Sequence, residues 1–552
     1  MTMAAAPFET HEVLNQPPPL VDYDLFGSDR ALTEAVVREG AGWAIEELGA
    51  FGRTLGRAET IEAGRLANAY PPVLRLFDRY GRRIDEVEFH PAWHELMALA
   101  IGEGLHTRPW AEPRPGAHVA RAAGVMLMVQ IEAGVQCPTT MTYGVVPALK
   151  KAPALAAEWL PRLYSRQYDK RMIPAARKTG VLMGMGMTEK QGGSDLRANM
   201  TRAVPLEGGG PGTAYRLDGH KWFFSAPMCD AFLVLAQAPG GLSCFFLPRF
   251  LPDGSRNAIH IQRLKDKLGN KANASSEVEF HAATGFLVGE EGRGVPTIIE
   301  MGNHTRLDCA LGSAGLMRQA VAQASHHTAH RSAFQKRLID QPLMTNVLAD
   351  LAIESEAATA LVLRLARAYD GQDDAAETAF RRLLTPATKY WICKRGPMLG
   401  AEAMEVLGGN GYVEEAIMGR LYRELPLNSI WEGSGNVMCL DTIRAARKSP
   451  DSLDVMLAEV ELCRGASAAM DAHIDALKDR ARALGSDEGA GRRDVEAIAK
   501  AVQASLLIRF SPSAISDAFV SSRISGDAGG AFGTLPPGID MRSIVARALP
   551  GL

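Results

Sequence analysis

The chain has few cysteines for its length, and they form no recognisable pattern. Its 552 residues include seven cysteines, an odd number, scattered without any C-x-x-C pair. This spacing argues against a disulfide framework and against a zinc site, so we expect no bound metal. Unpaired cysteines of this kind are typical of proteins in a reducing compartment.

Long apolar runs and an excess of one charge are also missing. No uninterrupted hydrophobic stretch is long enough to cross a bilayer, and residues 1–12 lack the basic-then-apolar order of a secretory signal. The chain carries 60 Lys and Arg against 63 Asp and Glu, a formal net charge of -3. The composition therefore predicts a soluble, cytoplasmic protein without a membrane segment, and it indicates no polyanion partner.

The residue pattern changes three times along the chain, as expected for two to four domains. An extended arm of about 20 residues precedes a helical segment, and aromatic and β-branched segments bounded by turns follow it. Helical spacing then returns, with one long helix predicted over 310–331 and two amphipathic helices near the C-terminus. The predicted domains are 1–185 (arm and helices), 186–290 (β), 291–447 (helices) and 448–552 (additional helices).

Two motifs in the predicted β region suit a flat, phosphate-bearing ligand. In Met185–Asp195, two glycines followed by Ser and Asp expose backbone N–H groups that can approach a pyrophosphate or a flavin edge. An ordinary glycine-rich turn explains this motif equally well. In Gly219–Ser225, strand alternation puts Phe223 and Ser225 on one face, an aromatic plate beside a hydroxyl. Taken alone, a core strand that ends in Ser explains the second motif better.

A third motif, near the end of the second helical segment, carries a candidate base. Glycines occur in Glu405–Tyr412 and again in Ser429–Asn436, where Glu432 lies between a tryptophan and a glycine. A carboxylate in such an apolar setting loses hydration, which raises its pKa and makes it a stronger base toward a carbon acid. The alternative is a surface glutamate in a turn.

In this order and spacing the motifs resemble those of the acyl-CoA dehydrogenase family. Residues 187–195 resemble the first family signature, and residues 407–412 resemble the second. Further family landmarks are matched at 266–269, 278–280, 289–294 and 331–335, and the resemblance thins after about residue 450. It implies an α+β multi-domain protein with the acyl-CoA dehydrogenase fold: an N-terminal helical domain, a middle β-barrel-like domain and a C-terminal four-helix bundle, here with an extra C-terminal helical segment.

The resemblance also implies a reaction and a cofactor. Members of the family bind FAD and oxidise an acyl thioester: a glutamate removes the α-proton while the β-hydride passes to flavin N5. By similarity Glu432 is that base. In some relatives the base comes from a position that is Thr305 here, and a threonine cannot serve. The electron acceptor and the natural substrate are not indicated.

The resemblance assigns cofactor contacts residue by residue. The flavin and its pyrophosphate are expected to contact the first motif, the Phe–Phe–Ser end of the second and the residues after Glu432, whereas a neighbouring subunit's FAD is expected to meet the 331–341 segment. A homotetramer is thus implied. The expected contacts within one subunit are Met187, Thr188, Gly193, Ser194, Phe223, Phe224, Ser225, Gly433 and Asn436, and those to the neighbour are Arg331, Phe334 and Gln341.

Two departures from the family pattern concern the substrate. Asn303 replaces the acid that usually precedes Arg306 by three residues, and Glu405 replaces a glutamine ahead of Gly408. Both changes predict weak activity on standard acyl-CoAs. The amino-acid sequence is most similar to the branch of the family associated with the response to DNA alkylation and with binding of double-stranded DNA.

The sequence supports DNA binding only locally. Residues 450–552 carry 11 Lys and Arg against 14 Asp and Glu, so their formal charge is 11 minus 14, or -3, whereas duplex binding needs cations that neutralise phosphates. Arg444, Arg447 and Lys448 form the candidate cluster, with Arg492 and Arg493 beyond a loop, and a solvated helix end is the alternative. Two hypotheses remain: a weak dehydrogenase linked to DNA alkylation, or a fully active short- or branched-chain acyl-CoA dehydrogenase with no nucleic-acid role.

Overall fold

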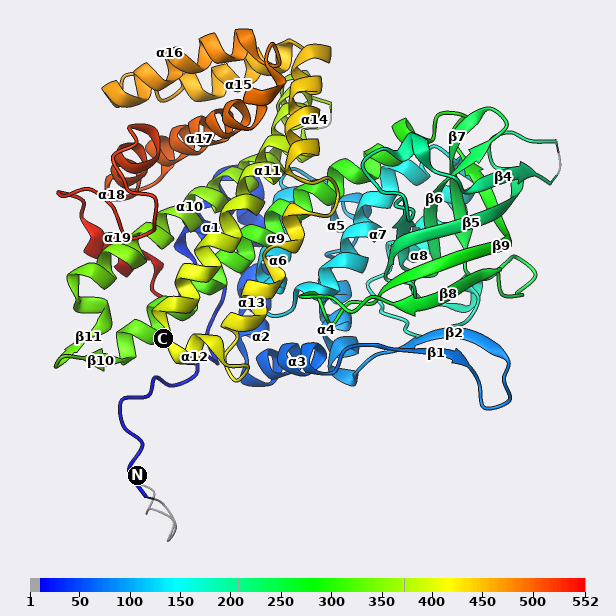
Figure 1. Ribbon diagram of the computed structural model, residues 1–552, viewed down its shortest axis with the longest axis horizontal. Helices are drawn as coiled ribbons and strands as arrows, with labels where there is room; N and C mark the ends of the chain where they lie inside the picture. The colour runs from blue at the N-terminus through cyan, green and yellow to red at the C-terminus, as the bar shows by residue number, and fades with distance from the viewer. Residues whose placement is uncertain (1–9, 207, 372, 552) are drawn as a thin grey trace.

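A barrel of β-strands lies beside a large set of helices, with a further helical layer packed on the opposite side of those helices (Figure 1). The computed structural model describes residues 10–206, 208–371 and 373–551. Helices precede the barrel in sequence, and helices follow it. This order confirms the expected α+β class, with an additional helical segment at the C-terminal end.

The N-terminal part is mostly helical, and its two most central helices are buried along most of their length. Every side chain of α6 and nearly every side chain of α7 is buried, which is why their sequences read as apolar all round rather than as amphipathic stripes. The helices are α1 (Arg30–Val36), α2 (Ile45–Gly56), α3 (Ala58–Ala69), α4 (Pro91–Gly102), α5 (Arg108–Ala111), α6 (Ala117–Val129), α7 (Gln136–Leu149) and α8 (Pro153–Leu163).

A two-stranded hairpin interrupts this helical part, which the sequence analysis did not anticipate. Strands β1 (Val73–Phe77) and β2 (Arg83–Glu88) pair antiparallel. The alternating exposure along β1 shows the period of two that distinguishes a strand from a helix. The buried Asp85 accepts a hydrogen bond from the backbone N–H of Ile261 at 3.0 Å, so the hairpin attaches to the β-barrel.

The middle strands close on themselves. Strands β6, β4, β5, β9 and β7 pair in that order, and β7 pairs back onto β6, while β3 joins β6 in parallel and β8 joins β9. Closure leaves no open edge in the ring, although the β4–β6 junction is a single pairing. The strands are β3 (Met183–Gly186), β4 (Arg202–Pro205), β5 (Ala214–Ser225), β6 (Ala231–Ala238), β7 (Gly241–Pro248), β8 (Ile259–Leu264) and β9 (Ser275–Val288).

A fully buried ion pair fixes the first motif to the barrel. The ammonium of Lys221, on β5, lies 2.6 Å from a carboxylate oxygen of Glu189, and neither side chain is exposed. Burial alone raises the pKa of Glu189, but Lys221 and hydrogen bonds from Thr201 and the Met200 N–H outweigh it and lower that pKa to about 2. The loop that follows Met187 is therefore anchored at its acidic residue.

Long helices after the barrel form the second helical part. The helix expected over 310–331 is the end of the 37-residue α9, which begins at Gly294. It packs against α6, α7, α10 and α11. A Cβ at Gly315 would meet the carbonyl oxygen of Met126 at 2.6 Å, so only glycine permits this approach of α9 to α6. The elements are α9 (Gly294–His330), β10 (Ser332–Ala333), β11 (Lys336–Arg337), α10 (Pro342–Asp370), α11 (Ala375–Val406), α12 (Gly409–Tyr412), α13 (Met418–Glu424) and α14 (Gly435–Lys448).

The last hundred residues form more helices than the two amphipathic patterns predicted. Both patterns are present, and their apolar faces are buried: Met470, Ile474, Leu477 and Leu484 in or just after α16, and Val495, Ile498, Val502 and Leu506 in α17. The final helix turns back to the start of the chain, where Arg547 pairs with Glu34 and Glu356. The helices are α15 (Asp451–Glu461), α16 (Ala468–Ala483), α17 (Gly491–Phe510), α18 (Ser513–Phe519), η9 (Val520–Ile524) and α19 (Met541–Ala548).

Two expectations from the sequence concern membrane-spanning helices and domain boundaries. Within the described residues, no helix combines the length and the hydrophobicity needed to span a bilayer. The domain boundaries at residues 185, 290 and 447 stay a prediction, because the helical and β parts make continuous contacts across them, as where α7 packs on β3.

The buried pair of Lys221 and Glu189 generates a stability prediction. Lys221→Met leaves the Glu189 carboxylate buried without its cation, which should lower the free energy of unfolding by about 3 to 5 kcal/mol. Urea unfolding monitored by circular dichroism measures this loss. Arg65→Met, which breaks the exposed pair with Glu62, should leave the unfolding midpoint almost unchanged. Equal small effects of the two substitutions would contradict the prediction.

Candidate active site

Glu432 lies in a left-handed turn between α13 and α14. Its φ is +58°, and that of the following Gly433 is +107°. A non-glycine residue in this region is strained unless its surroundings hold it there. The turn therefore needs an external support.

Two cations supply that support. The buried ammonium of Lys389, on α11, donates to the carbonyl oxygen of Trp431 at 2.8 Å and also to that of Gly433. The Arg306 Nε, on α9, donates to the carbonyl oxygen of Glu432 at 3.1 Å. Three consecutive carbonyls are thus held by two helices, and the position of the intervening carboxylate follows from this arrangement.

The carboxylate of Glu432 has one protein partner. Thr305 Oγ1 donates to Oε2 at 2.8 Å, and among the described residues no donor contacts Oε1. Burial raises the pKa of Glu432, while the Thr305 hydrogen bond and the charges of Arg306 and Lys389 act to lower it. The result is a carboxylate with a raised pKa and one oxygen free to accept a proton, which is what a general base for a weak carbon acid requires.

The hydroxyl of Ser225, at the end of β5, belongs to a short polar chain. Ser225 pairs with Ser275 across β5 and β9, and their Oγ atoms lie 3.3 Å apart. Lys267 Nζ donates to Ser275 Oγ at 3.0 Å. Burial lowers the pKa of Lys267 to about 8. Because Ser275 accepts from the ammonium, its own proton is available to Ser225, and the proton of Ser225 is then available to a ligand.

Cys137 connects the two halves of the site. This buried thiol on α7 has its pKa raised to about 12, chiefly by burial, with a smaller contribution from the charge of Glu432. The same thiol lies within hydrogen-bond reach of Ser225. Glu432 and Ser225, 207 positions apart in the sequence, therefore both lie near enough to this thiol to act on its pKa.

The loop of the first motif is shaped around Thr188. A Cβ at Gly193 would lie 2.4 Å from Thr188 Oγ1, so only glycine leaves room for that hydroxyl. Gly192 has a φ of +136° and open space where a Cβ would be. Ser194 is exposed and Met187 is half-buried. The loop thus presents hydroxyls and backbone N–H groups to the outside of the barrel, as an approaching phosphate requires.

Phe223 and Phe224 point to opposite faces of β5. Phe223 is 51% exposed, on the same face as Ser225, whereas Phe224 is fully buried and packs against Phe232 in a tilted arrangement, with ring centroids 4.3 Å apart. The expectation that Phe224 contacts the cofactor needs correction, because strand alternation turns its ring into the barrel core. Phe223 keeps the aromatic plate that the sequence predicted.

The N-terminus of α14 lies directly after Glu432. Gly433 and Ser434 lead into this 14-residue helix, and its cap residue Ser434 makes no side-chain capping bond. Asn436 is exposed, and its Oδ1 accepts a hydrogen bond from Arg492 Nε at 2.8 Å. A helix N-terminus with free N–H groups beside an arginine suits a phosphate group.

These features fit FAD. An exposed aromatic ring beside a free hydroxyl, a loop that only glycines allow, and an uncapped helix N-terminus match a flat ring and a pyrophosphate. Among the described residues, no group of three or more His, Cys, Asp or Glu is arranged to hold a metal ion.

The three residues expected to reach a neighbouring subunit lie far from this site. Arg331, Phe334 and Gln341 belong to the β10–β11 hairpin and the start of α10, at the opposite end of the long helices from the barrel (Figure 1). Phe334 is 95% exposed, and its φ is +51° at the tip of the hairpin. Gln341 Nε2 donates to the carbonyl oxygen of Ala333 at 2.9 Å. Within one chain these residues do not join Glu432.

Arg306 has a partner that the sequence analysis missed. Its Nη1 lies 2.8 Å from Asp441, which also pairs with Arg382. Asn303 accepts only a longer bond from the same Nη1, at 3.3 Å. Asp441, on α14, therefore serves as the counter-ion of Arg306 in place of an acid at position 303. The second departure from the family pattern, Glu405, is exposed.

The candidate DNA residues lie on the last two turns of α14. Arg444 is exposed and lies 3.8 Å from Asp441. Arg447 donates to the carbonyl oxygen of Gly485, and Lys448 is exposed. Residues three and four apart share a helix face, so the three cations lie together. Cations at a helix C-terminus also stabilise the helix dipole, which is the structural alternative.

Sequence reasoning missed, or gave no role to, five residues of the site: Lys389, Thr305, Lys267, Ser275 and Cys137. Lys267 lies in a matched family landmark, and Thr305 had been excluded as a base. Apart from the pair Lys267 and Ser275, which are 8 positions apart, their partners lie between 42 and 127 positions away, so the local sequence assigns them no role.

Comparisons with known proteins agree along most of the chain. A family model described as the adaptive response protein AidB N-terminal domain matches residues 15–170. Models described as the middle and C-terminal domains of acyl-CoA dehydrogenase match residues 184–283 and 292–447.

Individual proteins show the same likeness. The chain is 53% identical over 477 residues to AidB of Escherichia coli (strain K12), covering 86% of this chain and 87% of that protein. The Caenorhabditis elegans protein ACDH-11, solved in complex with C11-CoA, superposes with a TM-score of 0.82 at 26% identity over 94% of this chain and 93% of that one. A structure described as the apo form of Bd2924 gives a TM-score of 0.82 at 30% identity, over 90% of this chain and 99% of that one.

The hydrogen bond from Thr305 generates a pH prediction. Thr305→Val removes a donor to the ionised carboxylate, so the pKa of Glu432 should rise further above its usual value. Because a base works only when ionised, the acid limb of the pH profile for substrate-dependent flavin reduction should move to higher pH. Thr305→Ser keeps the hydroxyl and should keep the profile. Superimposable profiles for the valine variant and the original protein would contradict the role given to this contact.

Proposed function

This chain belongs to the acyl-CoA dehydrogenase family of FAD-dependent oxidoreductases, in the branch marked by the AidB N-terminal domain, and from that premise we propose that Glu432 removes the α-proton of an acyl thioester. The observation that carries this proposal is the free Oε1 of a carboxylate whose pKa burial raises, held in a left-handed turn by Lys389 and Arg306. When bound, FAD supplies the acceptor at N5 for the β-hydride.

The chain's own residues position the reactants. Phe223 offers a face for the ring, the Ser225 hydroxyl offers a donor beside it, and the Thr188 loop and the α14 N-terminus offer donors to the pyrophosphate. Holding base and acceptor on opposite sides of the substrate is an orientation effect worth several kcal/mol. Met187, Gly193, Ser194 and Gly433 complete the proposed cofactor contacts.

An acyl-CoA is the substrate class we propose, and the activity on standard acyl-CoAs is weak. The C. elegans relative was solved with C11-CoA. Here Asn303 carries no charge, and Arg306 is neutralised by Asp441 instead. A ligand that depends on a carboxylate at 303 loses that contact, which is a physical reason for slow turnover.

We also propose a homotetramer in the cytoplasm. Phe334 exposes 95% of its surface at a hairpin tip far from the barrel, an unusual position for a large aromatic ring in a monomer. Arg331 and Gln341 flank that tip. In this proposal the three residues contact the FAD of a neighbouring subunit, so the cofactor helps to hold the assembly together.

A link to the DNA alkylation response is the remaining part of the proposal. Arg444, Arg447 and Lys448 share one face of α14 and supply the contacts to duplex phosphates. The net charge of -3 over residues 450–552 confines such contacts to this cluster. A fully active short- or branched-chain dehydrogenase without a nucleic-acid role is the alternative function.

Removing the base tests the chemistry. Glu432→Gln keeps the shape of the turn but cannot accept the proton, so the FAD-loaded variant should stay yellow while anaerobic bleaching by a panel of acyl-CoAs slows at least about 100-fold. Stopped-flow absorbance measures the bleaching rate. Undiminished bleaching would remove Glu432 from the role of base.

Salt dependence tests the DNA link. Arg444→Ala should weaken binding to duplex DNA and reduce the slope of log K against log salt concentration by about 1, because one phosphate contact is lost. Fluorescence anisotropy across a salt series measures both quantities. Fast bleaching by one acyl-CoA together with no salt-dependent DNA binding would favour the alternative function.

A further inference from the structure

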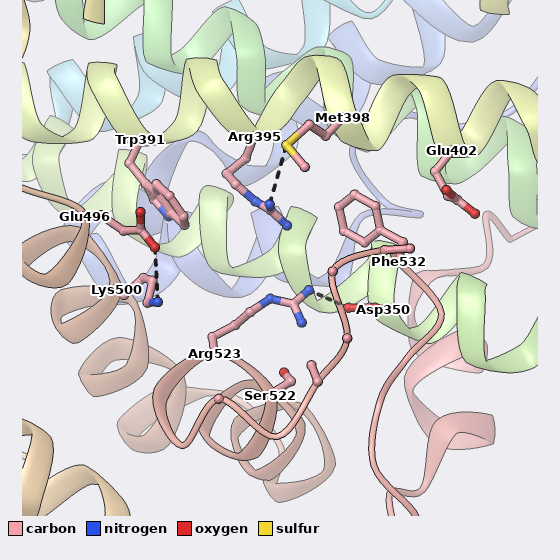
Figure 2. Close-up of a pocket in the computed structure, with 15 residues that line it drawn as sticks. Asp350, Trp391, Arg395, Met398, Glu402, Glu496, Lys500, Ser522, Arg523 and Phe532 are labelled. Atoms are coloured by element: carbon pink, nitrogen blue, oxygen red, sulfur yellow. Dashed lines mark hydrogen bonds and ion pairs between the residues drawn. The ribbon is translucent and has the colours of Figure 1, made fainter. Parts of the chain in front are cut away.

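A cavity of about 340 Å³ lies between the long helices and the C-terminal segment, apart from the site of Glu432. Its walls come from α10, α11, α17, η9 and the loop at residues 526–532 (Figure 2). This volume is that of a small-molecule site. None of the sequence motifs described above falls in it.

The floor of the cavity is a buried network of two arginines and two acids. Arg395 donates through Nε and Nη2 to the two carboxylate oxygens of Glu354, at 2.9 Å each. Arg523 donates through Nε to Glu354 at 3.1 Å and through Nη2 to Asp350, which also accepts from the Gly533 N–H at 2.8 Å. Each oxygen of both acids accepts at least one of these hydrogen bonds, so neither carboxylate is unpaired.

Several hydrogen-bond donors of the cavity, by contrast, have no strong acceptor in the protein. Arg395 Nη1 meets only the thioether of Met398, at 3.7 Å, and a thioether is a weak acceptor. No acceptor among the described residues contacts Arg523 Nη1. The ammonium of Lys500 uses one donor on Glu496, at 3.2 Å. Figure 2 shows the guanidinium groups of Arg395 and Arg523 on facing sides of the cavity, with Lys500 to one side next to Glu496.

The loop that closes the cavity adds backbone donors. Four glycines lie between positions 526 and 533. Within the described residues, the N–H groups of Ala528, Gly530 and Ala531 donate to no protein acceptor. A glycine-rich loop with free N–H groups is a familiar cradle for an oxyanion.

An apolar wall stands beside these donors. The Arg395 guanidinium lies 5.0 Å from the ring centroid of Phe532 and 5.6 Å from that of Trp391. We propose that this cavity is a second ligand site, which takes a small molecule with a phosphate or similar oxyanion group and an aromatic or aliphatic body. The oxyanion accepts from Arg395, Arg523, Lys500 and the loop amides, and the body packs on Phe532 and Trp391.

The other acids that line the cavity, Glu496 and Glu402, do not make it a cation site. Glu496 already pairs with Lys500. Glu402 is the lining acid without a protein partner, and it lies to one side of the arginines in Figure 2. Burial and the neighbouring Glu405 and Asp350 raise the pKa of Glu402, so the surroundings of this side chain oppose its negative charge.

Calorimetric titration of the FAD-loaded protein with inorganic phosphate and with phenyl phosphate, in a phosphate-free buffer, tests the site. We expect saturable binding of both, with phenyl phosphate binding more tightly. Lys500→Met should weaken both by about tenfold, because it removes a charge-assisted hydrogen bond. Phe532→Leu should weaken phenyl phosphate and leave inorganic phosphate unchanged.

The matched control is Lys478→Met, which removes a similar half-exposed lysine paired with Glu461 outside the cavity. It should leave both affinities unchanged. Absence of saturable binding, or equal losses in Lys500→Met and Lys478→Met, would overturn the proposal. Duplex DNA is a separate arm: if Lys500 is needed for DNA and not for the small phosphates, the cavity edge is a nucleic-acid contact and the small-molecule site is wrong.

Discussion

The left-handed turn at Glu432 is the constraint on which the rest of the site depends. A glutamate is sterically strained at φ +58°. The turn persists because Lys389 binds the backbone carbonyls of Trp431 and Gly433, and Arg306 binds that of Glu432 itself. Those two cations come from α11 and α9, so the position of the base is fixed by the packing of the two longest helices after the barrel. The same cations limit how far burial raises the pKa of the base.

The opposite wall of the site depends on a different part of the fold. The pairing of β5 with β9 sets Ser225 beside Ser275, and the buried Lys221–Glu189 pair holds the glycine loop against the same strand. Cys137, on an N-terminal helix, lies near enough to both walls for Glu432 and Ser225 to act on its pKa. The candidate site therefore combines an N-terminal helix, the barrel and the helices after it.

The C-terminal segment, residues 448–552, covers part of the second helical region. It covers α10 and α11, and its last helix ties back to α1 through Arg547. In covering these helices it also encloses the cavity above the Arg395 and Arg523 network. The segment supplies Arg523, Lys500 and the glycine loop to this cavity, whereas the acids that engage the arginines, Asp350 and Glu354, come from α10.

The sequence by itself determined the order of helices, barrel and helices and the family, and it predicted Glu432 as the base and Phe223 as the aromatic face of the cofactor site. Each of these follows from local signals, namely periodicity, glycine-bounded motifs and strand alternation, which need only neighbouring residues. The β1–β2 hairpin carried such a signal and was overlooked, and Phe224 was misassigned although alternation turns it inward.

Tertiary structure alone decided which side chains meet: Lys389 with Trp431 and Gly433, Asp441 in place of an acid at 303, Lys267 with Ser275, and the arginines of the second cavity. Most of these contacts join residues far apart in the chain, and the geometry of all of them is fixed only when helices and strands pack.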